Sequence, residues 1–523
     1  MNTTEFLAIT AAIVPDRPAI IFEKKKYTFG QLAERSNRVA NALTKMGVTK
    51  GDRVAILQVN CNQYVETYFG VAKIGAIFVP LNFRAKQNEL THMMNNSEAK
   101  VLFAGDRYID MVNSMKSNLT LHPKLISLDS KVEGMDNYDE ILKASSADDV
   151  VTEINDNDIT ILMYTAGTTG LPKGVPLRHN AFAVYVMGNV SPVDPDVQET
   201  NILTVPLYHV AGIQAMMAAV YGGRTIALMR QFEVNEWMET VQREKANRAM
   251  LVPTMLKRVI DHPDFKKYDL SSLKVITYGA ASMPFEVIKK AIEMFPGVMF
   301  INAFGQTETA STITMLGPED HMFTGKETPE EKEKKLKRLA GSIGRPMPDV
   351  EIQIWDDSGK PLPPGPENIG EIMARGERVM SGYWKDEAKT AKTLTKDGWL
   401  HTGDKGWMDE EGYIYLAGRG DDMIIRGGEN ISPEEVENVL YSHPKVADAA
   451  VIGVPDLEWG QQPRAIIVLK EGEKATEQEI IDYCKDKLAG FKRPRSVIFI
   501  DELPRTSTGK VQRKVLREIY GKP

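Results

Sequence analysis

The first hundred residues switch repeatedly between two spacings of apolar side chains. From Leu32 to Met46 apolar residues recur at helical spacing, which predicts an amphipathic helix that ends before Gly47. Short continuous apolar runs follow, and their length is typical of buried strands. The pattern predicts strands at 53–57, 76–80 and 99–103, with helices at 63–74 and 87–95 between them. This alternation predicts a largely parallel sheet with helices over its faces.

Three later strands are expected to end in small or polar residues. Apolar runs at 159–163, 275–278 and 299–302 are followed by the segments YTAGTTG, GAASM and AFGQTE. In open α/β sheets, ligands bind beyond the carboxyl ends of the strands. We therefore expect the three loops to converge on one site.

The pattern becomes looser elsewhere and then forms a separate C-terminal unit. Between Ser114 and Asp158 the pattern loosens and ends in the acidic run at 144–158, which predicts a solvated connection. The run PEEKEKKLKRL predicts an exposed helix. Short alternating stretches beyond Arg345, on either side of KPLPPGPENIG, predict a small β subdomain. The last part of the chain predicts helices at 433–441 and 477–488 and strands at 449–453 and 464–469. The expected fold is α/β: a large N-terminal domain of helix-covered β-sheets plus the β subdomain, with a mobile α+β C-terminal lid domain.

The composition is that of a soluble globular protein with more than one domain. The chain has 523 residues, 42% of them hydrophobic and 26% charged, and a formal net charge of −7. This negative balance argues against a nucleic-acid or membrane-surface binder, which needs a basic face.

Cysteine content and apolar segments indicate the compartment. Cys61 and Cys484 lie far apart, which predicts neither a disulfide framework nor a zinc site. The N-terminus lacks the features of a secretory signal, and the apolar helix expected at 211–221 is too short to span a bilayer. We expect a cytoplasmic protein without integral membrane association, as a monomer or homodimer.

One stretch concentrates the chemistry of a phosphate site. Residues 164–175 read YTAGTTGLPKGV, in which Gly167, Gly170 and Gly174 allow the backbone to approach a ligand closely. Threonine hydroxyls add donors, and Lys173 adds a positive charge. A solvated surface turn is the alternative, because Gly, Thr and Pro are common in turns. The Walker pattern does not match, since Lys173 is followed by Gly174 rather than by Ser or Thr.

Further motifs follow this loop in order along the chain. They read LYHVAG, YGAASM, NAFGQTE, WLHTGD, GRGDDMIIRGGENI and PRTSTGKVQRK. Together with the loop they resemble the adenylate-forming superfamily over nearly the whole chain, that is, the acyl-CoA synthetases with their luciferase and peptide-synthetase relatives. The resemblance implies an enzyme that activates a carboxylic acid as an acyl-adenylate and then transfers the acyl group to coenzyme A.

The resemblance also assigns the nucleotide site. Thr165, Thr168 and Lys173 are expected to hold the β and γ phosphates, and Glu308 to bind Mg²⁺ together with Thr168. Asp404 would accept hydrogen bonds from both ribose hydroxyls. The full set of implied ATP- and coenzyme-binding residues is Thr165, Ala166, Gly167, Thr168, Thr169, Gly170, Lys173, Gly279, Ala280, Ala281, Asn302, Ala303, Phe304, Gly305, Gln306, Thr307, Asp404, Arg419, Gly427, Gly428 and Lys510.

Lys510 near the C-terminus has two interpretations. A basic C-terminal stretch is usually a solvated face. The resemblance instead implies that Lys510 inserts from the lid and neutralises charge as the carboxylate attacks the α-phosphorus. Lys173 and Lys510 would then belong to different domains, so adenylation requires lid closure.

The implied division of the chain is an adenylation domain at 1–418, a hinge at 419–423 and the lid at 424–523. Asp421 is the expected pivot. Rotation about it would withdraw Lys510 and bring Gly427 and Gly428 up to line a channel for pantetheine.

The acyl pocket is implied by family placement. Its expected wall consists of His209, Val210, Ala211, Gly212 and Gly305. His209 would lie between this pocket and the thiol tunnel, although a packed histidine is the alternative. Small and apolar wall residues favour an uncharged cyclic, aromatic or medium-chain acid. The implied catalytic residues are Thr165, Lys173, His209, Glu308 and Lys510.

The expected activity is that of an AMP-forming acid–CoA ligase, with ATP, Mg²⁺ and CoA, a small carboxylic acid as substrate and no nucleic acid. The reaction can also run backward toward ATP. Three alternatives remain open: adenylation for a carrier-protein thiol, oxidation of the adenylate as in luciferases, and a nucleotide-sensing protein with a degenerate site. The last predicts missing motif residues, yet Lys173, Glu308, Asp404, Arg419 and Lys510 are all present.

Overall fold

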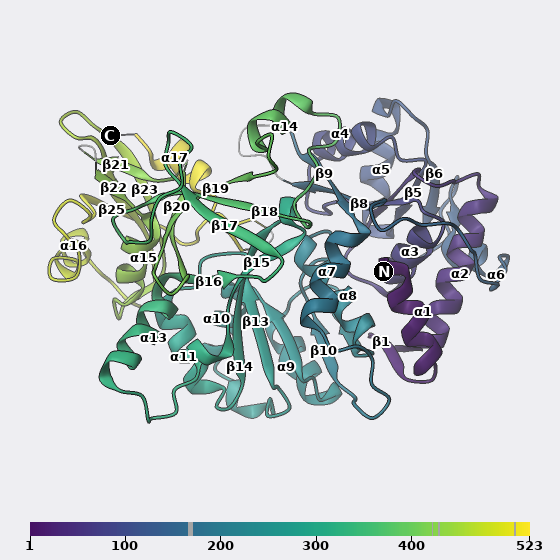
Figure 1. Ribbon diagram of the computed structural model, residues 1–523, viewed down its shortest axis with the longest axis horizontal. Helices are drawn as coiled ribbons and strands as arrows, with labels where there is room; N and C mark the ends of the chain where they lie inside the picture. Colours follow the sequence, from purple (N-terminus) through teal and green to yellow (C-terminus); the bar gives the residue numbers. More distant parts are fainter. Residues whose placement is uncertain (166–170, 421, 427–428, 507–508, 523) are drawn as a thin grey trace.

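The computed structural model describes residues 1–165, 171–420, 422–426, 429–506 and 509–522. They form a large body of sheets and helices, with the C-terminal part of the chain along one side of it (Figure 1). In this described part, no helix combines the length and the apolar character needed to cross a bilayer.

The first sheet has the phosphate-loop hairpin at one edge. Its strands are β3 (Arg53–Leu57), β4 (Ile77–Pro80), β5 (Val101–Ala104), β6 (Lys124–Ser127), β7 (Asp136–Asn137), β8 (Ile159–Thr165) and β9 (Lys173–Arg178). Their order is β7-β6-β5-β3-β4-β8-β9, and neighbours are parallel except for the antiparallel pair β8 and β9. Val54, Phe78 and Val101 face one another in register and are buried, as expected for a parallel sheet covered on both faces.

The second sheet is larger, and it combines two strands from near the N-terminus with strands from residues 200–419. Its first strands are β1 (Pro18–Phe22), β2 (Lys25–Thr28), β10 (Thr200–Leu203), β11 (Thr225–Leu228), β12 (Arg248–Leu251), β13 (Val275–Gly279) and β14 (Met299–Gln306). The others are β15 (Ser311–Leu316), β16 (Ser342–Pro346), β17 (Val350–Trp355), β18 (Gly370–Gly376), β19 (Leu400–Met408) and β20 (Ile414–Arg419). Their order is β17-β18-β19-β20-β16-β15-β14-β13-β12-β10-β11-β1-β2. The β unit beyond Arg345 therefore continues this sheet through β16.

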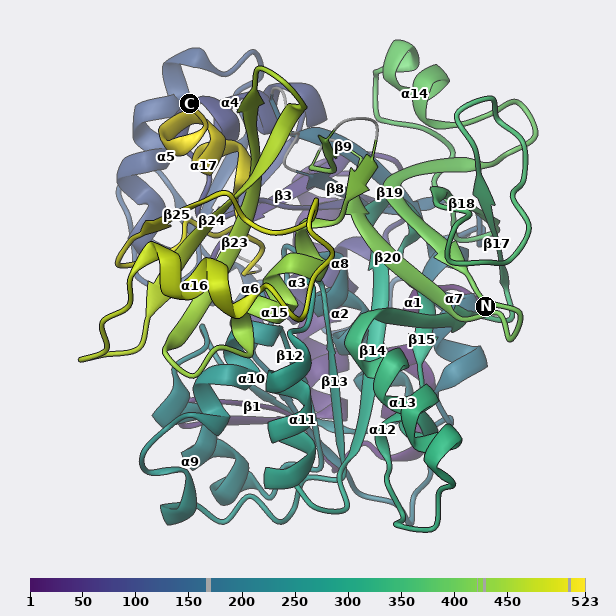
Figure 2. The same cartoon turned by 90° about the vertical axis from the view of Figure 1, so that its left-hand side faces the viewer.

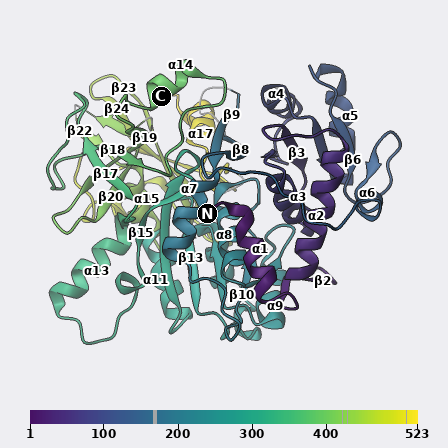
Figure 3. The same ribbon diagram turned by 45° about the vertical axis from the view of Figure 1, so that its right-hand side comes forward.

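Helices cover both sheets of the large body. They are α1 (Thr3–Ile13), α2 (Phe29–Lys45), α3 (Asn62–Lys73), α4 (Gln87–Ser97), α5 (Ile109–Met115), α6 (Tyr138–Lys143), α7 (His179–Asn189), α8 (Val210–Tyr221), α9 (Val234–Glu244), α10 (Pro253–Ile260), α11 (Phe285–Met294), α12 (Pro318–His321), α13 (Pro329–Gly341) and α14 (Glu387–Thr393). Short 3₁₀ helices are η1 (Asp106–Tyr108), η2 (Lys116–Asn118), η3 (Phe265–Lys267) and η4 (Thr307–Thr309). Helices α1, α2 and α3 lie side by side (Figure 3).

Local sequence explains why α2 begins where it does. The Thr28 hydroxyl accepts a hydrogen bond from the Gln31 N–H at 3.2 Å, and the Gln31 side-chain oxygen accepts one from the Thr28 N–H at 2.9 Å. This reciprocal capping box satisfies two donors that would otherwise lack a helical partner. Leu32, Val39 and Leu43 then bury the inner face of the helix.

The C-terminal unit is a small α+β layer in front of the large body (Figure 2). Its strands are β21 (Ile424–Arg426), β22 (Glu429–Ile431), β23 (Val446–Asp456), β24 (Gly460–Leu469) and β25 (Ser496–Phe499). Its helices are α15 (Pro433–Tyr441), α16 (Glu477–Tyr483) and α17 (Arg513–Tyr520). The strand order is β22-β21-β24-β23, with β25 paired to β24. Helix α15 contacts α11 and β20, and this places the lid against the second sheet.

Most of the predicted elements are confirmed, and three predictions need correction. The strand at 53–57 and the helix at 433–441 have the predicted bounds. The helix expected at 477–488 ends at Tyr483, and the loosely patterned stretch before Asp158 contains β6 and α6. The strand expected at 299–302 continues to Gln306, because β15 pairs with it along its second half.

Candidate active site

The phosphate loop connects the ends of two antiparallel strands. Thr165 and Lys173 face each other in register, at the end of β8 and the start of β9. Residues 164–175 were expected to be loop throughout, but Tyr164, Thr165 and Lys173 to Val175 belong to the strands, because the hairpin pairs their backbone groups. The predicted binding residues Ala166, Gly167, Thr168, Thr169 and Gly170 lie outside the described residues.

Tyr383 lies between Lys173 and Glu308. The Lys173 Nζ atom is 5.6 Å from the centroid of the Tyr383 ring, and the Tyr383 hydroxyl donates a hydrogen bond to Glu308 Oε1 at 2.9 Å. Burial, followed by the positive charge of Lys389, lowers the pKa of Lys173 below its usual 10.5. Burial and the Glu308 carboxylate raise the pKa of Tyr383, so its hydroxyl keeps the proton that it donates. Tyr383 thus contacts the Lys173 ammonium group with its ring and the Glu308 carboxylate with its hydroxyl.

A short backbone segment connects Glu308 to the phosphate hairpin. The Met380 N–H donates to the Glu308 carbonyl at 2.8 Å, and the Trp384 N–H donates to the Gly174 carbonyl at 2.8 Å. Tyr383 precedes Trp384 and is positioned by both contacts. Sequence reasoning missed Tyr383, and the available signal was the pair of aromatic residues after Gly382 in SGYW.

The glycine-rich segments of β13 and β14 are built for close strand contact. A Cβ atom at Gly279 would lie 2.1 Å from the Ala303 carbonyl oxygen, and one at Gly305 would lie 1.7 Å from the Ser311 carbonyl oxygen. Both positions therefore require glycine for packing alone. Ala280, directly after β13, has a φ of 66°, which is uncommon for a residue with a side chain. The segment 303–306, expected to be a loop, is the end of strand β14, and η4 with Glu308 follows it.

Hydrogen bonds join the end of β14 to Asp404. The Gln306 Nε2 group donates to the Thr402 carbonyl at 3.3 Å, and the Asp404 N–H donates to Thr402 Oγ1 at 3.1 Å. Asp404 is 6% exposed and pairs in register with Arg419 of β20. Residues predicted from two distant motifs, NAFGQTE and WLHTGD, are therefore neighbours in the fold.

The C-terminal unit places Lys510 near His209, the residue that precedes α8. The Thr506 N–H donates to the Lys510 carbonyl at 2.7 Å, which closes a tight turn. Gly509 has a φ of 80°, and a Cβ atom there would lie 2.8 Å from Thr254 Oγ1 of α10. Burial, followed by the positive charge of Lys510, lowers the pKa of His209 to about 3. Gly509 of the lid thus packs against α10 of the large body.

His209 directly precedes α8 and is followed by the predicted pocket residues. Its ring centroid is 4.2 Å from that of Tyr208. Val210, Ala211 and Gly212 form the first turn of α8, and a Cβ atom at Gly212 would lie 2.5 Å from the Pro206 carbonyl oxygen. The lowered pKa keeps the imidazole of His209 neutral at physiological pH.

Two family models match the chain in sequence order. The model for AMP-binding enzymes matches residues 7–384, and the model for the C-terminal domain of AMP-binding enzymes matches residues 435–510. The chain belongs to the AMP-binding enzyme family. Both matches fall on units that the structure separates, the large body and the lid.

Relatives of this AMP-binding enzyme are similar over nearly full length. An indoleacetate–CoA ligase from Aromatoleum aromaticum is 32% identical over 526 residues, covering 100% of this chain and 99% of the relative. A feruloyl-CoA synthase from an Amycolatopsis species is 34% identical over 514 residues, covering 98% of this chain and 97% of the relative. The crystal structure of the anthranilate CoA ligase AuaEII with anthranoyl-AMP superposes with a TM-score of 0.89 at 29% identity, covering 100% of this chain and 97% of that one.

The remaining predicted site residues of this AMP-binding enzyme stay predictions. Asp421, Gly427 and Gly428 lie outside the described residues. The roles assigned to the others also stay predictions. Lys173 starts β9, Glu308 lies in η4 directly after β14, and Asp404 lies within β19. Lys510 lies close enough to His209, the residue before α8, for its charge to lower the pKa of that histidine.

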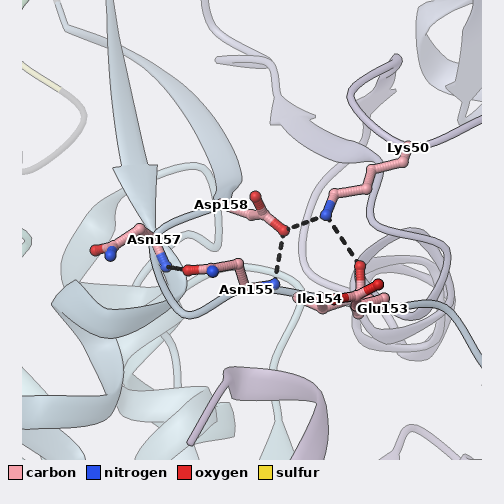
Figure 4. A pocket seen from close by; sticks show the side chains of 6 residues that line it. All are labelled: Lys50, Glu153, Ile154, Asn155, Asn157 and Asp158. Carbon is pink, nitrogen blue, oxygen red and sulfur yellow. Dashed lines mark hydrogen bonds and ion pairs between the residues drawn. The ribbon is translucent and has the colours of Figure 1, made fainter.

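A surface cavity of about 610 Å³ lies away from this constellation (Figure 4). Lys50, Glu153, Asn155 and Asp158 line it, just before the start of β8, whereas Thr165 ends the same strand. The Lys50 Nζ group contacts Asp158 at 2.7 Å and the Glu153 carbonyl at 2.9 Å. The polar groups around the cavity contact one another. We therefore interpret the cavity as part of the folded connection before β8 and not as a binding site.

Proposed function

We propose that this AMP-binding enzyme is an AMP-forming acid–CoA ligase. It joins a carboxylic acid to ATP as an acyl-adenylate, releases pyrophosphate, and then transfers the acyl group to the thiol of CoA. The position of Lys510 beside His209 is the observation that supports this most directly. A protein that only senses a nucleotide has no need to bring a second cation from a separate domain to the acyl side of the site.

In the first step, a carboxylate oxygen attacks the α-phosphorus, and the bond from that phosphorus to the bridging oxygen breaks. Both reactants are anions, so positive charge that is already in place lowers the barrier. Thr165 and Lys173 at the phosphate hairpin hold the β and γ phosphates that leave as pyrophosphate. Lys510 approaches the α-phosphate from the lid, and Asp404 accepts hydrogen bonds from the ribose.

The donor set at Glu308 fits Mg²⁺. Mg²⁺ prefers hard oxygen ligands and usually binds through one or two carboxylates plus substrate phosphates. Among the described residues, no three or more His, Cys, Asp or Glu side chains gather to form a metal site made of protein ligands alone. At Glu308, one carboxylate oxygen accepts the hydrogen bond from Tyr383. When bound, the ion supplies charge neutralisation on the phosphates. Thr168, the second proposed ligand, lies outside the described residues.

The second step requires the lid to move. A closed lid positions Lys510 but leaves little room for a long thiol. We propose that residues 419–423 form the hinge between a domain at 1–418 and a lid at 424–523, with Asp421 as pivot. Rotation brings Gly427 and Gly428 to the thiol channel. His209, which is neutral, would form the boundary between this channel and the acyl pocket.

An aromatic acid is the favoured substrate. The relatives described above are named for indoleacetate, ferulate and anthranilate, which all contain an aromatic ring. The pocket residues Val210, Ala211 and Gly212 are small or apolar, which favours an uncharged acid of modest bulk. Cyclic and medium-chain acids have the same character. We also propose a cytoplasmic location and a monomer or homodimer.

The test follows AMP and pyrophosphate release with ATP, Mg²⁺, CoA and a panel of benzoate, phenylacetate, cinnamate, cyclohexanecarboxylate and octanoate. We expect AMP and an acyl-CoA with at least one aromatic acid. ADP as the product would refute the mechanism. Transfer to a phosphopantetheine carrier protein but not to free CoA would favour the carrier-protein alternative, and ATP binding without AMP release would favour a sensor. Supplying acyl-CoA, AMP and pyrophosphate tests reversal toward ATP.

A further inference from the structure

A buried glutamine on the acyl-pocket helix has unsatisfied hydrogen-bond donors. Gln214 of α8 is 6% exposed. Its Oε1 atom accepts a hydrogen bond from the Thr312 hydroxyl at 3.4 Å. Its Nε2 group has no hydrogen-bond partner among the residues that the structure describes. Burying an amide donor without a partner lowers stability, so such a group usually meets water or a ligand.

The position of this amide is well defined by its neighbours. Thr312 is 4% exposed, lies on β15 and pairs in register with Gly305 of β14. Arg378, itself fully buried, donates to the Thr312 carbonyl, which fixes that strand. The contact with Thr312 therefore orients the Gln214 oxygen toward β15 and leaves Nε2 to point elsewhere. Gly305 belongs to the acyl wall that the sequence resemblance implies.

Helix geometry places Gln214 at a defined depth from the reacting end. His209 precedes α8 and lies beside Lys510, the residue that would act on the carboxylate. Gln214 follows His209 by five positions in the sequence, which is about 7.5 Å along a helix axis and about 140° around it, on the side of α8 that faces Thr312 of β15. This separation is similar to that between the carboxylate of an arylacetate or arylacrylate and a substituent on the far side of its ring.

Other buried polar atoms without a partner do not offer the same argument. Trp237 Nε1 also has none among the described residues, but its ring is fully buried within the apolar cluster of α9 to α11. Gln214 instead lies about 1.4 turns from His209 on the helix that starts at the proposed pocket.

We propose that Gln214 Nε2 donates a hydrogen bond to an oxygen on the acyl group, so that the enzyme selects oxygenated aromatic acids over plain hydrocarbon acids. This inference rests on the proposed function. A hydroxyl, methoxy or keto oxygen on the far side of the ring satisfies the buried donor. An unsubstituted ring leaves the donor unpaired in the complex, and sites built around a buried polar group discriminate strongly against such analogues.

The experiment compares matched acids that differ by one oxygen. The pairs are 4-hydroxyphenylacetate with phenylacetate and 4-hydroxycinnamate with cinnamate, and the readout is kcat/KM for pyrophosphate release. For the wild-type enzyme we expect a preference of about tenfold or more for the hydroxylated member of at least one pair. In Gln214→Met, a substitution of similar volume, the ratio should fall toward one.

A buried glutamine with satisfied groups provides the control. Gln63 of α3 is 7% exposed and its Nε2 group donates to the Leu128 carbonyl at 3.2 Å. Gln63→Met should lower the Tm and leave the acid ratio unchanged. Gln214→Met removes the hydrogen bond from Thr312 but also removes a buried donor without a partner among the described residues, so the Tm of the ligand-free protein should fall less than in Gln63→Met.

The possible failures are distinguishable. Wild-type enzyme without preference in either pair, or an unchanged ratio in Gln214→Met, would overturn the role of Gln214 while leaving the ligase function in place. A fall in Tm equal to that of Gln63→Met would show that the amide is already paired, for example with water, and would also overturn it. Absence of pyrophosphate release with every acid would instead refute the proposed function.

Discussion

The turn that presents Lys510 is held by one arginine. Arg505 Nη2 donates to both carboxylate oxygens of Asp448 at 2.8 Å, and Arg505 Nη1 donates to the Gly509 carbonyl at 2.5 Å. The Tyr441 hydroxyl donates to the same carboxylate. We call these four residues the Arg505 clamp. It connects the residue before Lys510 to β23 and to the end of α15, so it should determine where the lysine points when the lid is closed.

The expected cost of breaking the clamp follows from its geometry. Hydrogen bonds to charged groups contribute roughly 1.5–3 kcal/mol. The side chains of Arg505 and Asp448 are 22% and 26% exposed, so solvent screens part of their interaction. We therefore take about 2 kcal/mol as the free energy that the clamp contributes to the closed turn. If the closed turn loses that free energy, the adenylation rate should fall about 30-fold, since 1.36 kcal/mol corresponds to tenfold in rate.

The assay separates the two half-reactions. Arg505→Met should lower ATP–pyrophosphate exchange by about 30-fold while thiolysis of supplied acyl-AMP stays largely unchanged, because Lys510 serves the first step. Lys445→Met is the matched control, since it breaks another lid ion pair, Lys445 to Glu479 at 2.8 Å. Equal losses in both half-reactions, or the same loss in the control, would refute the reasoning.

Three further predictions concern the same division of labour and the N-terminal helix. Lys510→Ala should stop adenylation yet leave thiolysis of supplied acyl-AMP largely intact, whereas Lys173→Ala should chiefly raise the KM for ATP; a common loss of both steps in Lys510→Ala would contradict this. Asp421→Pro should spare pyrophosphate exchange but abolish thioester formation, and equal inhibition of both would rule out the hinge. Burial lowers the pKa of His179 to about 4, and its Nδ1 accepts a hydrogen bond from the Thr3 N–H at 3.3 Å. Below pH 6.5 the unfolded chain therefore binds more protons than the folded one, so stability is complete above that value and is lost as the pH falls toward 4. The Tm of His179→Gln should change less over this range than that of the wild type, and parallel curves would contradict the assignment.

Elements that depend on local pattern were predictable from sequence. The strand at 53–57 is a short apolar run, and the helix at 433–441 has Ser432 as its cap and Pro433 at its first position. The order of the glycine-rich and charged motifs also indicated the family, because each motif keeps its residue types over a few neighbouring positions. Family membership and reaction class therefore followed from the chain itself.

Strand ends and the Glu308 surroundings were not predictable in the same way. Residues 303–306 are small and polar and have the composition of a loop, yet they are strand because β15 lies across from them. Because Gly305 has no side chain, the Ser311 carbonyl can lie close to its Cα atom. This requirement for glycine arises only from the packing of β15 against β14. Tyr383 reaches Glu308 from a segment 75 residues away in the chain.

The sequence by itself determined the family, the order of domains and the types of residue that can handle a nucleotide. Tertiary structure alone decided that Tyr383 joins Lys173 to Glu308 and that Arg505 holds the Lys510 turn. It also decided that the buried Gln214 Nε2 group has no partner among the described residues. The physical reason is that periodicity and motif spacing report local preferences. Whether a polar group is paired depends instead on which distant elements pack against it.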